Sequence, residues 1–522
     1  MSKIIDLIKQ KKYQNAEIEA KKELKINPNS FDLNKMLAVS FLAQKKYNMA
    51  LIAFNKCHNI NADDYDVNVN LSLIFNIIQD YRSSLKFCEK ALKINTNRPE
   101  VHHNLANCYL YIDELDKAEK HILKSIELRG GMETNEIMEF KDTLNIYTDI
   151  LMAMGKIDLF KKVCKEILNK GIYFGDIFRK LLRNDKKSIS EKYLIDLNNI
   201  LREVDNYGNL VDRNLTKAGI YSCIAEYNQS INQKKSEDFY ILGNKLISDL
   251  HRDSLYNRQE KTKKIIKMFD GIDLKSYTSN IPIDRGEGLI FIIGMPRSGT
   301  TLTESILSTA DNCVAGGEKV FFHIQCSPII SNYNKDGFKS NVFEDLGKNY
   351  LEIIDIQRKG NKFYVDKLPE NYLYYKFIKT ALPGAKFIHM HRDPWDNAIS
   401  LFKQNFSKEL FYASTFFGIA LEYANYENIM RVWKSSDKHD IIDVDYQDLV
   451  TNTKDTISKI WDFCGFEGLY NESQRKKHFA QTASKHQVTK DIYSTSLKKE
   501  EFLGYKDQFS RDLESQRLFW RG

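Results

Sequence analysis

The chain has 522 residues, of which 42% are hydrophobic and 28% are charged, and its formal net charge is +7. It contains 8 prolines and 24 glycines, which excludes collagen, a disordered chain rich in these residues, and a sandwich or barrel with frequent turns. Basic and acidic residues are interleaved, and the densest basic run, residues 258–264, is interpreted as a solvated helix face rather than a nucleic-acid site. The composition therefore predicts a soluble protein of long helices with several cores and no nucleic-acid partner.

The cysteines and the N-terminal segment indicate where the protein works. The 8 cysteines show no metal-ligand spacing, and in a chain of this length they indicate reduced thiols of a cytosolic protein. The first residues, MSKIIDLIKQKKYQ, are amphipathic, and no apolar run reaches the roughly 18 residues that a membrane-spanning helix needs. We therefore expect a cytoplasmic protein with neither an export signal nor a membrane anchor.

Residues 1–130 repeat with a period of 34 residues. The positions that share this period are Tyr13, Tyr47, Tyr81 and Leu115; Ala16, Ala50, Ser84 and Ala118; and Ile26, Ile60, Ile94 and Leu128. A unit of this length is typical of a helix-turn-helix repeat, in which small residues lie where two helices approach closely. The pattern resembles tetratricopeptide repeats (TPR). It predicts an α-solenoid whose concave face binds a protein or peptide, with a purely structural extension as the alternative.

Residues 131–280 keep the helical spacing of apolar residues but lose the strict period. This change indicates either divergent repeats or a helical bridge. The segment NIPIDRGEG at 280–288 is rich in turn-forming residues, and it marks the predicted boundary of a C-terminal domain at residues 286–515.

A strand, a glycine-bounded loop and a helix are predicted in succession from residue 289. The apolar run LIFII (289–293) has the length of a strand, GMPRSGTT (294–301) follows it, and LTESILS has helical spacing. Loop amides and a helix N-terminus together form a phosphate cradle. In the Walker A pattern a lysine binds the β- and γ-phosphates, and this chain has Thr300 at that position. Arg297 supplies a cation from another position in the loop. The loop therefore predicts a shorter 5′-group than a triphosphate, such as a 5′-phosphosulfate; a tight turn without a ligand is the alternative.

A second strand is predicted at AKFIHMH (385–391), and the motif RDPWDNAIS follows it. Asp393 and Pro394 are typical of a helix N-terminus, so Arg392 is expected at the strand end and Ser400 two turns into the helix. A guanidinium and a hydroxyl beside the first loop could hold a second phosphate. The alternative is a surface salt bridge and a packing serine.

The two motifs together resemble the signature of the sulfotransferase family for 3′-phosphoadenosine 5′-phosphosulfate (PAPS), and the resemblance covers residues 286–515. Their fusion to TPR units resembles the bacterial TPR-sulfotransferases and, in the catalytic half, the tyrosylprotein sulfotransferases. The tryptophan that the family has after its SxxQV loop is Glu500 here. Further segments are similar to family elements: GGE at 316–318 to the catalytic-glutamate segment, DKLP at 366–369 to the lysine segment, DYQDLV at 445–450 to the YExL element near the adenine, and SKHQV at 484–488 to the SxxQV loop.

The resemblance implies a P-loop-like α/β domain with a parallel central sheet, which uses PAPS to sulfonate an acceptor hydroxyl and needs no metal. It implies that Glu318 is the base for the acceptor proton, and that Lys367, Arg297 and Ser484 neutralise the leaving phosphate oxygen. Sulfuryl transfer is similar to loose phosphoryl transfer, so positioning and charge would provide most of the catalysis. The residues implied to hold the donor are Arg297, Ser298, Gly299, Thr300, Thr301, Arg392, Ser400, Tyr446, Ser484 and Lys499.

Several alternatives stay open for the site. His389 and His391 alternate on the second predicted strand and therefore share a face, where they could be zinc ligands or an alternative base. Lys367 could simply pair with its neighbour Asp366. The HRD run at 391–393 is similar to the kinase HRDxxxxN loop, but its Asn falls one residue early and no GxGxxG, VAIK or DFG segment accompanies it. A TPR scaffold that binds a nucleotide without turnover is the non-enzyme alternative.

The acceptor is expected to be a protein tyrosine. The glutamate-type site resembles the tyrosylprotein enzymes, and a TPR array could present a polypeptide as the protein's partner. A carbohydrate or small-molecule hydroxyl is the alternative, because the fold and the donor site do not fix the acceptor.

Overall fold

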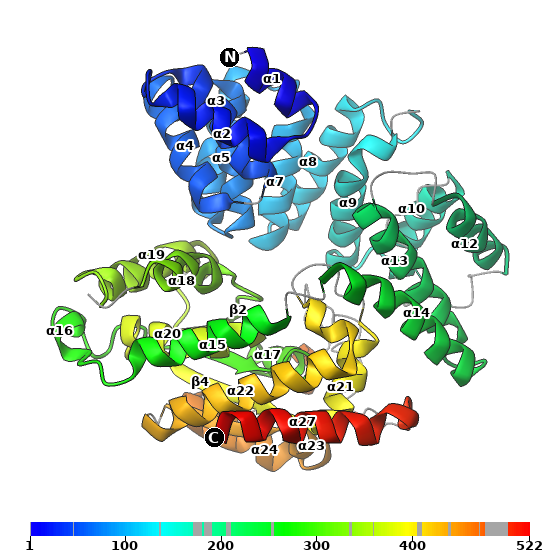
Figure 1. The fold of residues 1–522 in the computed structure, drawn as a ribbon, viewed down its shortest axis with the longest axis vertical. Coiled ribbons are helices and arrows are strands. Elements are labelled where there is room, and N and C mark those ends of the chain that lie inside the picture. The colour runs from blue at the N-terminus through cyan, green and yellow to red at the C-terminus, as the bar shows by residue number, and fades with distance from the viewer. Residues whose placement is uncertain are drawn as a thin grey trace. The chain divides into compact units, whose positions relative to one another are not determined.

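The structure is a computed structural model that describes residues 2–44, 46–134, 137–170, 180–181, 191–204, 210–251, 255–333, 337–358, 360–404, 410–436, 440–468, 470–475 and 500–521. The chain divides into two compact units, Met1–Val163 and Cys164–Gly522. Among the described residues the first unit is helical, and the second combines helices with a five-stranded sheet (Figure 1). The boundaries expected from the sequence at 130, 280 and 286 stay predictions.

The N-terminal unit consists of helices whose starts follow the 34-residue period. Tyr13, Tyr47, Tyr81 and Leu115 are the first residues of α2, α4, α6 and α8. The small residues three positions later in each helix are fully buried, which allows the close helix approach that the period predicts. The helices are α1 (Ser2–Lys9), α2 (Tyr13–Leu24), α3 (Phe31–Ala43), α4 (Tyr47–Ile60), α5 (Tyr65–Ile77), α6 (Tyr81–Ile94), α7 (Pro99–Tyr111), α8 (Leu115–Leu128), η1 (Ile137–Phe140), α9 (Lys141–Ala153) and the first half of α10 (Ile157–Asn169), which continues past Val163.

Polar side chains fix where other helices of this unit begin. Ser30 Oγ accepts a hydrogen bond from the Leu33 amide at the start of α3 (3.4 Å), and Asp64 accepts one from the Val67 amide at the start of α5 (2.8 Å). Such caps satisfy amides that the helix itself leaves without partners. The turn residues between repeats therefore determine the helix starts, and the predicted all-α repeat fold is confirmed.

The C-terminal unit contains a parallel sheet with the strand order β2-β3-β1-β4-β5. The central strand β1 pairs with β3 on one side, where Ile290 lies opposite Val365, and with β4 on the other, where Phe291 lies opposite Phe387. All residues of β1 are buried, as expected for a strand covered on both faces. The strands are β1 (Leu289–Gly294), β2 (Cys313–Ala315), β3 (Phe363–Asp366), β4 (Lys386–His391) and β5 (Ile441–Asp445).

Helices cover both faces of this sheet. Ile388 packs in one apolar cluster with Trp461 of α24, while Phe387, its neighbour in β4, packs in another cluster with Trp433 of α22. None of the helices in the described part of the chain is long and apolar enough to cross a membrane. The helices are α12 (Glu191–Glu203), α13 (Leu210–Asn228), α14 (Gln233–His251), α15 (Leu255–Phe269), α16 (Lys275–Thr278), α17 (Thr300–Leu307), α18 (Phe321–Asn332), α19 (Val342–Arg358), η5 (Pro369–Tyr374), α20 (Tyr375–Ala381), α21 (Pro394–Phe402), η6 (Phe411–Ser414), α22 (Phe416–Ser436), α23 (Tyr446–Thr451), α24 (Thr453–Cys464), α25 (Glu472–Arg475), η7 (Leu503–Tyr505) and α27 (Lys506–Arg521).

The basic run 258–264 lies in α15 and differs from the sequence prediction. Arg258 forms ion pairs with Glu370 (2.5 Å) and Glu422 (2.7 Å), and its side chain is 19% exposed. Glu260, in contrast, is exposed. The predicted solvated helix face is therefore wrong for the side of α15 that carries Arg258, because two carboxylates distant in sequence hold this guanidinium inside the unit.

Candidate functional site

The segment after β1 forms a tight loop that leads into α17. Gly299 precedes α17 with a φ of 101°, and Arg297 in the same loop has a φ of 70°. A Cβ on Gly294 would lie 2.2 Å from the Met390 carbonyl oxygen of β4, so the strands can approach closely only with glycine there. Ser298 Oγ is buried and has no hydrogen-bond partner among the described residues. The predicted succession of strand, turn and helix is therefore present. The turn also carries a buried hydroxyl that has no hydrogen-bond partner among the described residues.

The second predicted motif lies directly against this loop. Arg297 Nε donates to Ser400 Oγ of α21 (3.1 Å), and Arg392 Nη1 donates to the Arg297 carbonyl oxygen (3.2 Å). Asn397 Nδ2 donates to the Pro296 carbonyl oxygen (3.1 Å). Burial lowers the pKa of the Arg392 guanidinium, which is 7% exposed. Two guanidinium groups and a hydroxyl, far apart in sequence, thus gather at the carboxyl ends of β1 and β4.

Tyr446, which directly follows β5, packs against the loop at Gly299. Asp445 caps α23 by accepting from the Gln447 amide (2.6 Å), so Tyr446 is the first residue of this helix. The Arg392 guanidinium carbon lies 4.5 Å from the centroid of the Tyr446 ring, in range for a cation–π contact. A Cβ on Gly299 would lie 2.4 Å from the Tyr446 ring. Gly299 therefore both makes the turn and leaves room for the aromatic ring.

Glu318 and Lys367 form a close ion pair at the ends of β2 and β3. Lys367 Nζ donates to Glu318 Oε1 at 2.5 Å, and the exposed fractions of the two side chains are 0% for Lys367 and 40% for Glu318. The Lys367 amide also donates to the Gly317 carbonyl oxygen (2.9 Å). Asp366 instead accepts a hydrogen bond from Tyr350 (2.6 Å). The alternative in which Lys367 merely pairs with Asp366 therefore gives way to a pair that connects the GGE and DKLP segments.

Two residues that the sequence singled out lie outside the described residues. These are Ser484 and Lys499, together with the SKHQV segment. The other predicted site residues fall into two groups in the structure. Arg297, Arg392, Ser400 and Tyr446 are connected around the loop, and Glu318 pairs with Lys367.

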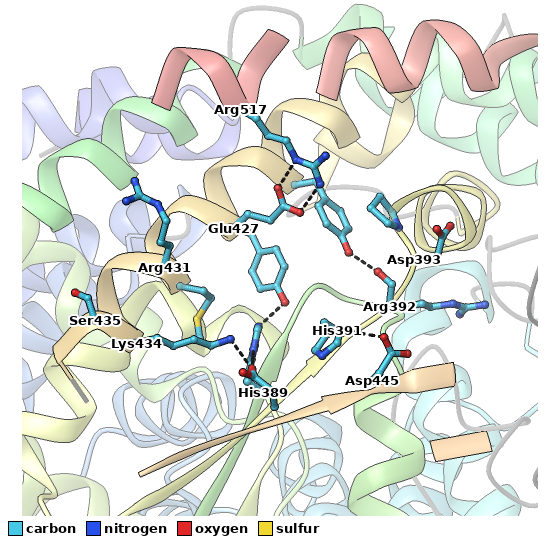
Figure 2. Close-up of a pocket in the computed structure, with 15 residues that line it drawn as sticks. His389, His391, Arg392, Asp393, Glu427, Arg431, Lys434, Ser435, Asp445 and Arg517 are labelled. Carbon is cyan, nitrogen blue, oxygen red and sulfur yellow. Dashed lines mark hydrogen bonds and ion pairs between the residues drawn. The ribbon is translucent and has the colours of Figure 1, made fainter. Parts of the chain in front are cut away.

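The two histidines of β4 share a face, as their alternation predicts, and line a cavity of about 710 Å³ (Figure 2). Both ring nitrogens of His389 have partners, Asp443 at 2.6 Å and Tyr426 at 2.5 Å. Burial lowers the pKa of His389 to about 4. His391 lies 3.2 Å from Asp445 on the neighbouring strand. The spacing of the two histidines is thus explained by cross-strand pairs between β4 and β5.

The same view shows how this cavity is bounded. Arg517 of α27 binds Glu427 of α22 through two hydrogen bonds, of 2.7 and 2.6 Å (Figure 2). The Arg392 carbonyl oxygen accepts from Tyr423 (2.6 Å), while the Arg392 guanidinium lies by Tyr446. In the described part of the chain no group of three or more His, Cys, Asp or Glu side chains could hold a metal ion. The charges that line this cavity are therefore largely paired with one another.

Sequence reasoning missed Glu304, which supports the turn before Glu318. Glu304 is the fifth residue of α17 and is 1% exposed. Its Oε1 accepts from the Gly317 amide at 2.8 Å. The signal in the sequence was an acidic residue on an otherwise uncharged helix directly after the loop.

Comparison with known proteins agrees with this geometry. Residues 290–471 match the model of the sulfotransferase family, and residues 99–131 match a tetratricopeptide-repeat model. The chain therefore carries a sulfotransferase-family domain in its C-terminal unit. Its N-terminal unit carries tetratricopeptide repeats.

Two curated relatives cover part of the chain. An uncharacterized protein of Aquifex aeolicus is 31% identical over 229 residues, which are 40% of this chain and 30% of the relative. A Caenorhabditis briggsae protein named as a candidate protein-tyrosine sulfotransferase is 34% identical over 112 residues, 20% of this chain and 40% of the relative. The chain thus spans well under half of either relative. A mouse sulfotransferase solved in complex with PAP is 15% identical, with a TM-score of 0.29, covering 48% of this chain and 94% of that chain.

Proposed function

We propose that this protein is a sulfotransferase that moves a sulfuryl group from PAPS to an acceptor hydroxyl. The observation that supports the proposal most is the contact between the two sequence motifs, in which Arg297 binds Ser400 and Arg392 binds the Arg297 carbonyl oxygen. Cations and a hydroxyl therefore lie together beside a loop that leads into a helix N-terminus. The match of residues 290–471 to the sulfotransferase family supports the same activity.

The loop fits the 5′ end of such a donor. Ser298 Oγ is a buried hydroxyl that lacks a partner among the described residues, and the amides at the start of α17 favour an anion. Thr300 stands where a Walker lysine would be, so the site lacks the cation that clamps a triphosphate. We assign the 5′-phosphosulfate to this P-loop-like turn.

The side chains of the second motif and Tyr446 fit the 3′-phosphate and the adenine of the donor. Arg392 offers a planar fork of donors suited to a phosphate, and Ser400 lies on the same side through its bond to Arg297. Tyr446 supplies an aromatic face for the adenine. The proposed donor-binding residues are Arg297, Ser298, Gly299, Thr300, Thr301, Arg392, Ser400 and Tyr446, with Ser484 and Lys499 from outside the described residues.

The Glu318–Lys367 pair supplies the chemistry. PAPS provides the sulfuryl group and leaves as adenosine 3′,5′-bisphosphate. Glu318 takes the proton of the acceptor hydroxyl as the oxygen of that hydroxyl bonds to sulfur. Protonation of Glu318 removes the carboxylate that balances the buried Lys367 ammonium. The Lys367 ammonium then stabilises the negative charge on the leaving oxygen, and Arg297 and Ser484 donate further hydrogen bonds to this oxygen.

Nucleotide binding tests the donor assignment. Calorimetry on the full chain should show tighter binding of adenosine 3′,5′-bisphosphate than of ATP, because the site has cations for a 3′-phosphate and no Walker lysine. Tighter binding of ATP would contradict the proposal. Bisphosphate binding without any transfer from radiolabelled PAPS would favour the nucleotide-binding scaffold instead.

The proposed acceptor is a protein tyrosine, with a carbohydrate or small-molecule hydroxyl as the alternative. The name of the Caenorhabditis briggsae relative supports the tyrosine, and TPR units offer a surface for the polypeptide that would carry it. A transfer assay with radiolabelled PAPS should label tyrosine peptides and not their phenylalanine counterparts. Label that appears only in glycan or small-molecule pools would replace the tyrosine assignment. The cytoplasmic location stays a prediction.

A further inference from the structure

The helix α15 carries two cations whose partners belong to elements that follow the proposed catalytic residues. α15 lies outside residues 290–471, which match the sulfotransferase family, and before the domain boundary predicted at residue 286. Its Arg258 and Lys261 lie one helical turn apart and therefore share a face. Both side chains form hydrogen bonds with other elements of the C-terminal unit, so this face of the helix needs an explanation other than solvation.

Arg258 binds the element that follows Lys367. Its Nη2 donates to Glu370 of η5 (2.5 Å) and to Glu422 of α22 (2.7 Å), and its Nε donates to Glu422 as well (2.9 Å). Glu422 is 1% exposed, and it also accepts from Tyr372 of η5 (2.7 Å). Because an arginine that donates through two nitrogens to one carboxylate is fixed in orientation, this guanidinium joins α15, η5 and α22 in a defined geometry.

The element η5 is in turn bound to both neighbours of Lys367. It begins directly after Leu368. The Asn371 amide donates to the Leu368 carbonyl oxygen (2.9 Å), and the Asn371 side chain donates to Asp366 Oδ1 (3.3 Å). A shift of η5 would therefore displace the Lys367 ammonium from its 2.5 Å contact with Glu318.

Lys261 connects α15 to the element that follows Glu318. Lys261 Nζ donates to Tyr374 Oη at the end of η5 (2.7 Å), and Tyr374 Oη forms a hydrogen bond with His323 Nδ1 of α18 (3.2 Å). The helix α18 begins at Phe321, shortly after Glu318 in the chain. One face of α15 thus contacts, directly or through one tyrosine, the elements that follow both members of the proposed catalytic pair.

We propose that α15 positions the Glu318–Lys367 pair for sulfuryl transfer, and that Arg258 is the positioning residue through which it does so, by fixing η5 between α15 and α22. The effect of Arg258 on turnover rests on the proposed function, whereas its effect on η5 does not. A displacement of about 1 Å in a catalytic group can cost about 100-fold in rate, so a residue that touches no substrate can still control the reaction. The catalytic unit then includes a helix that precedes the residues matched by the family.

Kinetics of Arg258→Met on the full chain test this role. Methionine keeps an apolar side chain without the guanidinium, so we expect kcat to fall about 10- to 100-fold. The affinity for adenosine 3′,5′-bisphosphate should change less than about twofold, because the donor loop is held by other contacts. Lys267→Met, at an exposed lysine of the same helix, is the matched control and should match the wild type. An unchanged kcat in Arg258→Met, or equal losses of kcat and nucleotide affinity, would overturn the proposal.

Milder variants keep the test valid if Arg258→Met does not fold. Arg258→Lys keeps a cation without the planar fork, so kcat should lie between those of the wild type and Arg258→Met. Tyr374→Phe removes only the hydroxyl between Lys261 and His323, so kcat should fall about two- to tenfold, as expected for one hydrogen bond. Unchanged kcat in both Arg258→Lys and Tyr374→Phe would overturn the proposal.

A double variant separates positioning from a general structural defect. In Lys367→Met the ammonium that η5 holds in place is absent, so the addition of Arg258→Met should lower kcat further by less than about threefold. Losses that multiply in full would mean that Arg258 does not act through Lys367, and they would overturn the proposal.

Hydrogen exchange gives a readout that needs no turnover. In Arg258→Met the amides of residues 366–374 should exchange about tenfold faster, while Lys267→Met leaves them unchanged. Unchanged exchange of this segment in Arg258→Met would overturn the positioning role even if the enzyme is active. A wild-type chain that transfers no sulfuryl group would overturn the proposed function alone.

Discussion

The two units of this protein bury polar groups in opposite ways. In the N-terminal unit the buried polar groups are mostly neutral and their partners lie in the same or the next repeat: Asn104 donates to Ser72 Oγ (2.8 Å), and Ser84 donates to the Ser72 carbonyl oxygen (3.1 Å). In the C-terminal unit, in contrast, the Lys367 side chain is fully buried and forms an ion pair with Glu318 from another segment.

This difference in buried polar groups corresponds to a repeat scaffold in the N-terminal unit and a candidate active site in the C-terminal unit. A buried amide or hydroxyl costs little once it has a hydrogen bond, whereas a buried charge costs much more and needs a matched partner. Repeats can therefore be added at low cost, each satisfying its neighbour. Arg392 and the Glu318–Lys367 pair lie beyond the carboxyl ends of strands, where parallel folds bind ligands.

The largest effect is expected at Glu318. Glu318→Gln should lower the turnover of PAPS by about 10² to 10⁴, the range for a general base, while the affinity for adenosine 3′,5′-bisphosphate stays the same. Steady-state transfer assays and calorimetry measure the two quantities. Glu260→Gln, at an exposed residue of the same unit, serves as the control. Unchanged turnover in Glu318→Gln would show that Glu318 is not the general base. It would also contradict the assignment of the ion pair with buried Lys367 to catalysis.

A smaller effect is expected at Arg392. Arg392→Ala removes a guanidinium that we assign to the 3′-phosphate, so the affinity for adenosine 3′,5′-bisphosphate should fall about 10- to 100-fold. The affinity for adenosine 5′-phosphate, which lacks the 3′-phosphate, should change far less. Calorimetry with both nucleotides measures the ratio. Equal losses for the two would mean that Arg392 supports the loop rather than the phosphate.

In the N-terminal unit the corresponding test is steric. Ala50→Leu inserts a large side chain at a fully buried helix crossing, and overpacking of this kind costs about 1–3 kcal/mol. Thermal unfolding should show the loss, while nucleotide affinity stays unchanged because the site lies in the other unit. Ile52→Leu, at an exposed position of the same helix, is the control. A loss of nucleotide affinity in Ala50→Leu would show that the two units are not independent.

The smallest effect concerns Glu17, a buried charge in the N-terminal unit. Burial raises its pKa, but hydrogen bonds from Lys21, Lys46 and Gln44 outweigh burial and lower the pKa to about 2. Because the folded-state pKa lies below the unfolded value of about 4.3, this stabilisation is present above that value and is lost as the pH falls towards 2.

Glu17→Gln should therefore lower Tm by about 2–4 °C at neutral pH. The difference from the wild type should close as the pH falls below 4.3, the reference value for a glutamate, to about 2. Calorimetric scans at several pH values measure it. A difference that persists at the lowest pH would assign the effect to packing rather than charge.

The sequence predicted features that depend on local pattern. The 34-residue period predicted a helical repeat, and in the structure the residues Tyr13, Tyr47, Tyr81 and Leu115, which share that period, each begin a helix. The strand, loop and helix around Gly299 were also predicted, since apolar run, turn and helical spacing follow one another directly. The period did not predict burial, and Ile26, which follows it, is 88% exposed.

Features that depend on distant partners could not be predicted. Arg258 meets Glu370 and Glu422, which are 112 and 164 residues away, so its run was taken for a solvated face. Glu304 has the same explanation, because the amide that it binds belongs to Gly317, in the turn before Glu318. The resemblance implied one role for Glu318 and another for Lys367. It did not imply that the two side chains contact each other, which only the folded structure shows.

The position of β1 in the sheet has a consequence for how the chain folds during synthesis. β1 pairs with β3 and β4, and β2 pairs with β3, so none of the described strands has a partner until residues 363–366 have been made. The repeats before it use contacts between neighbouring helices, which form fast. We therefore expect the repeats to fold while β1 still lacks its neighbours, and the apolar run at 289–293 to be exposed to aggregation during that interval.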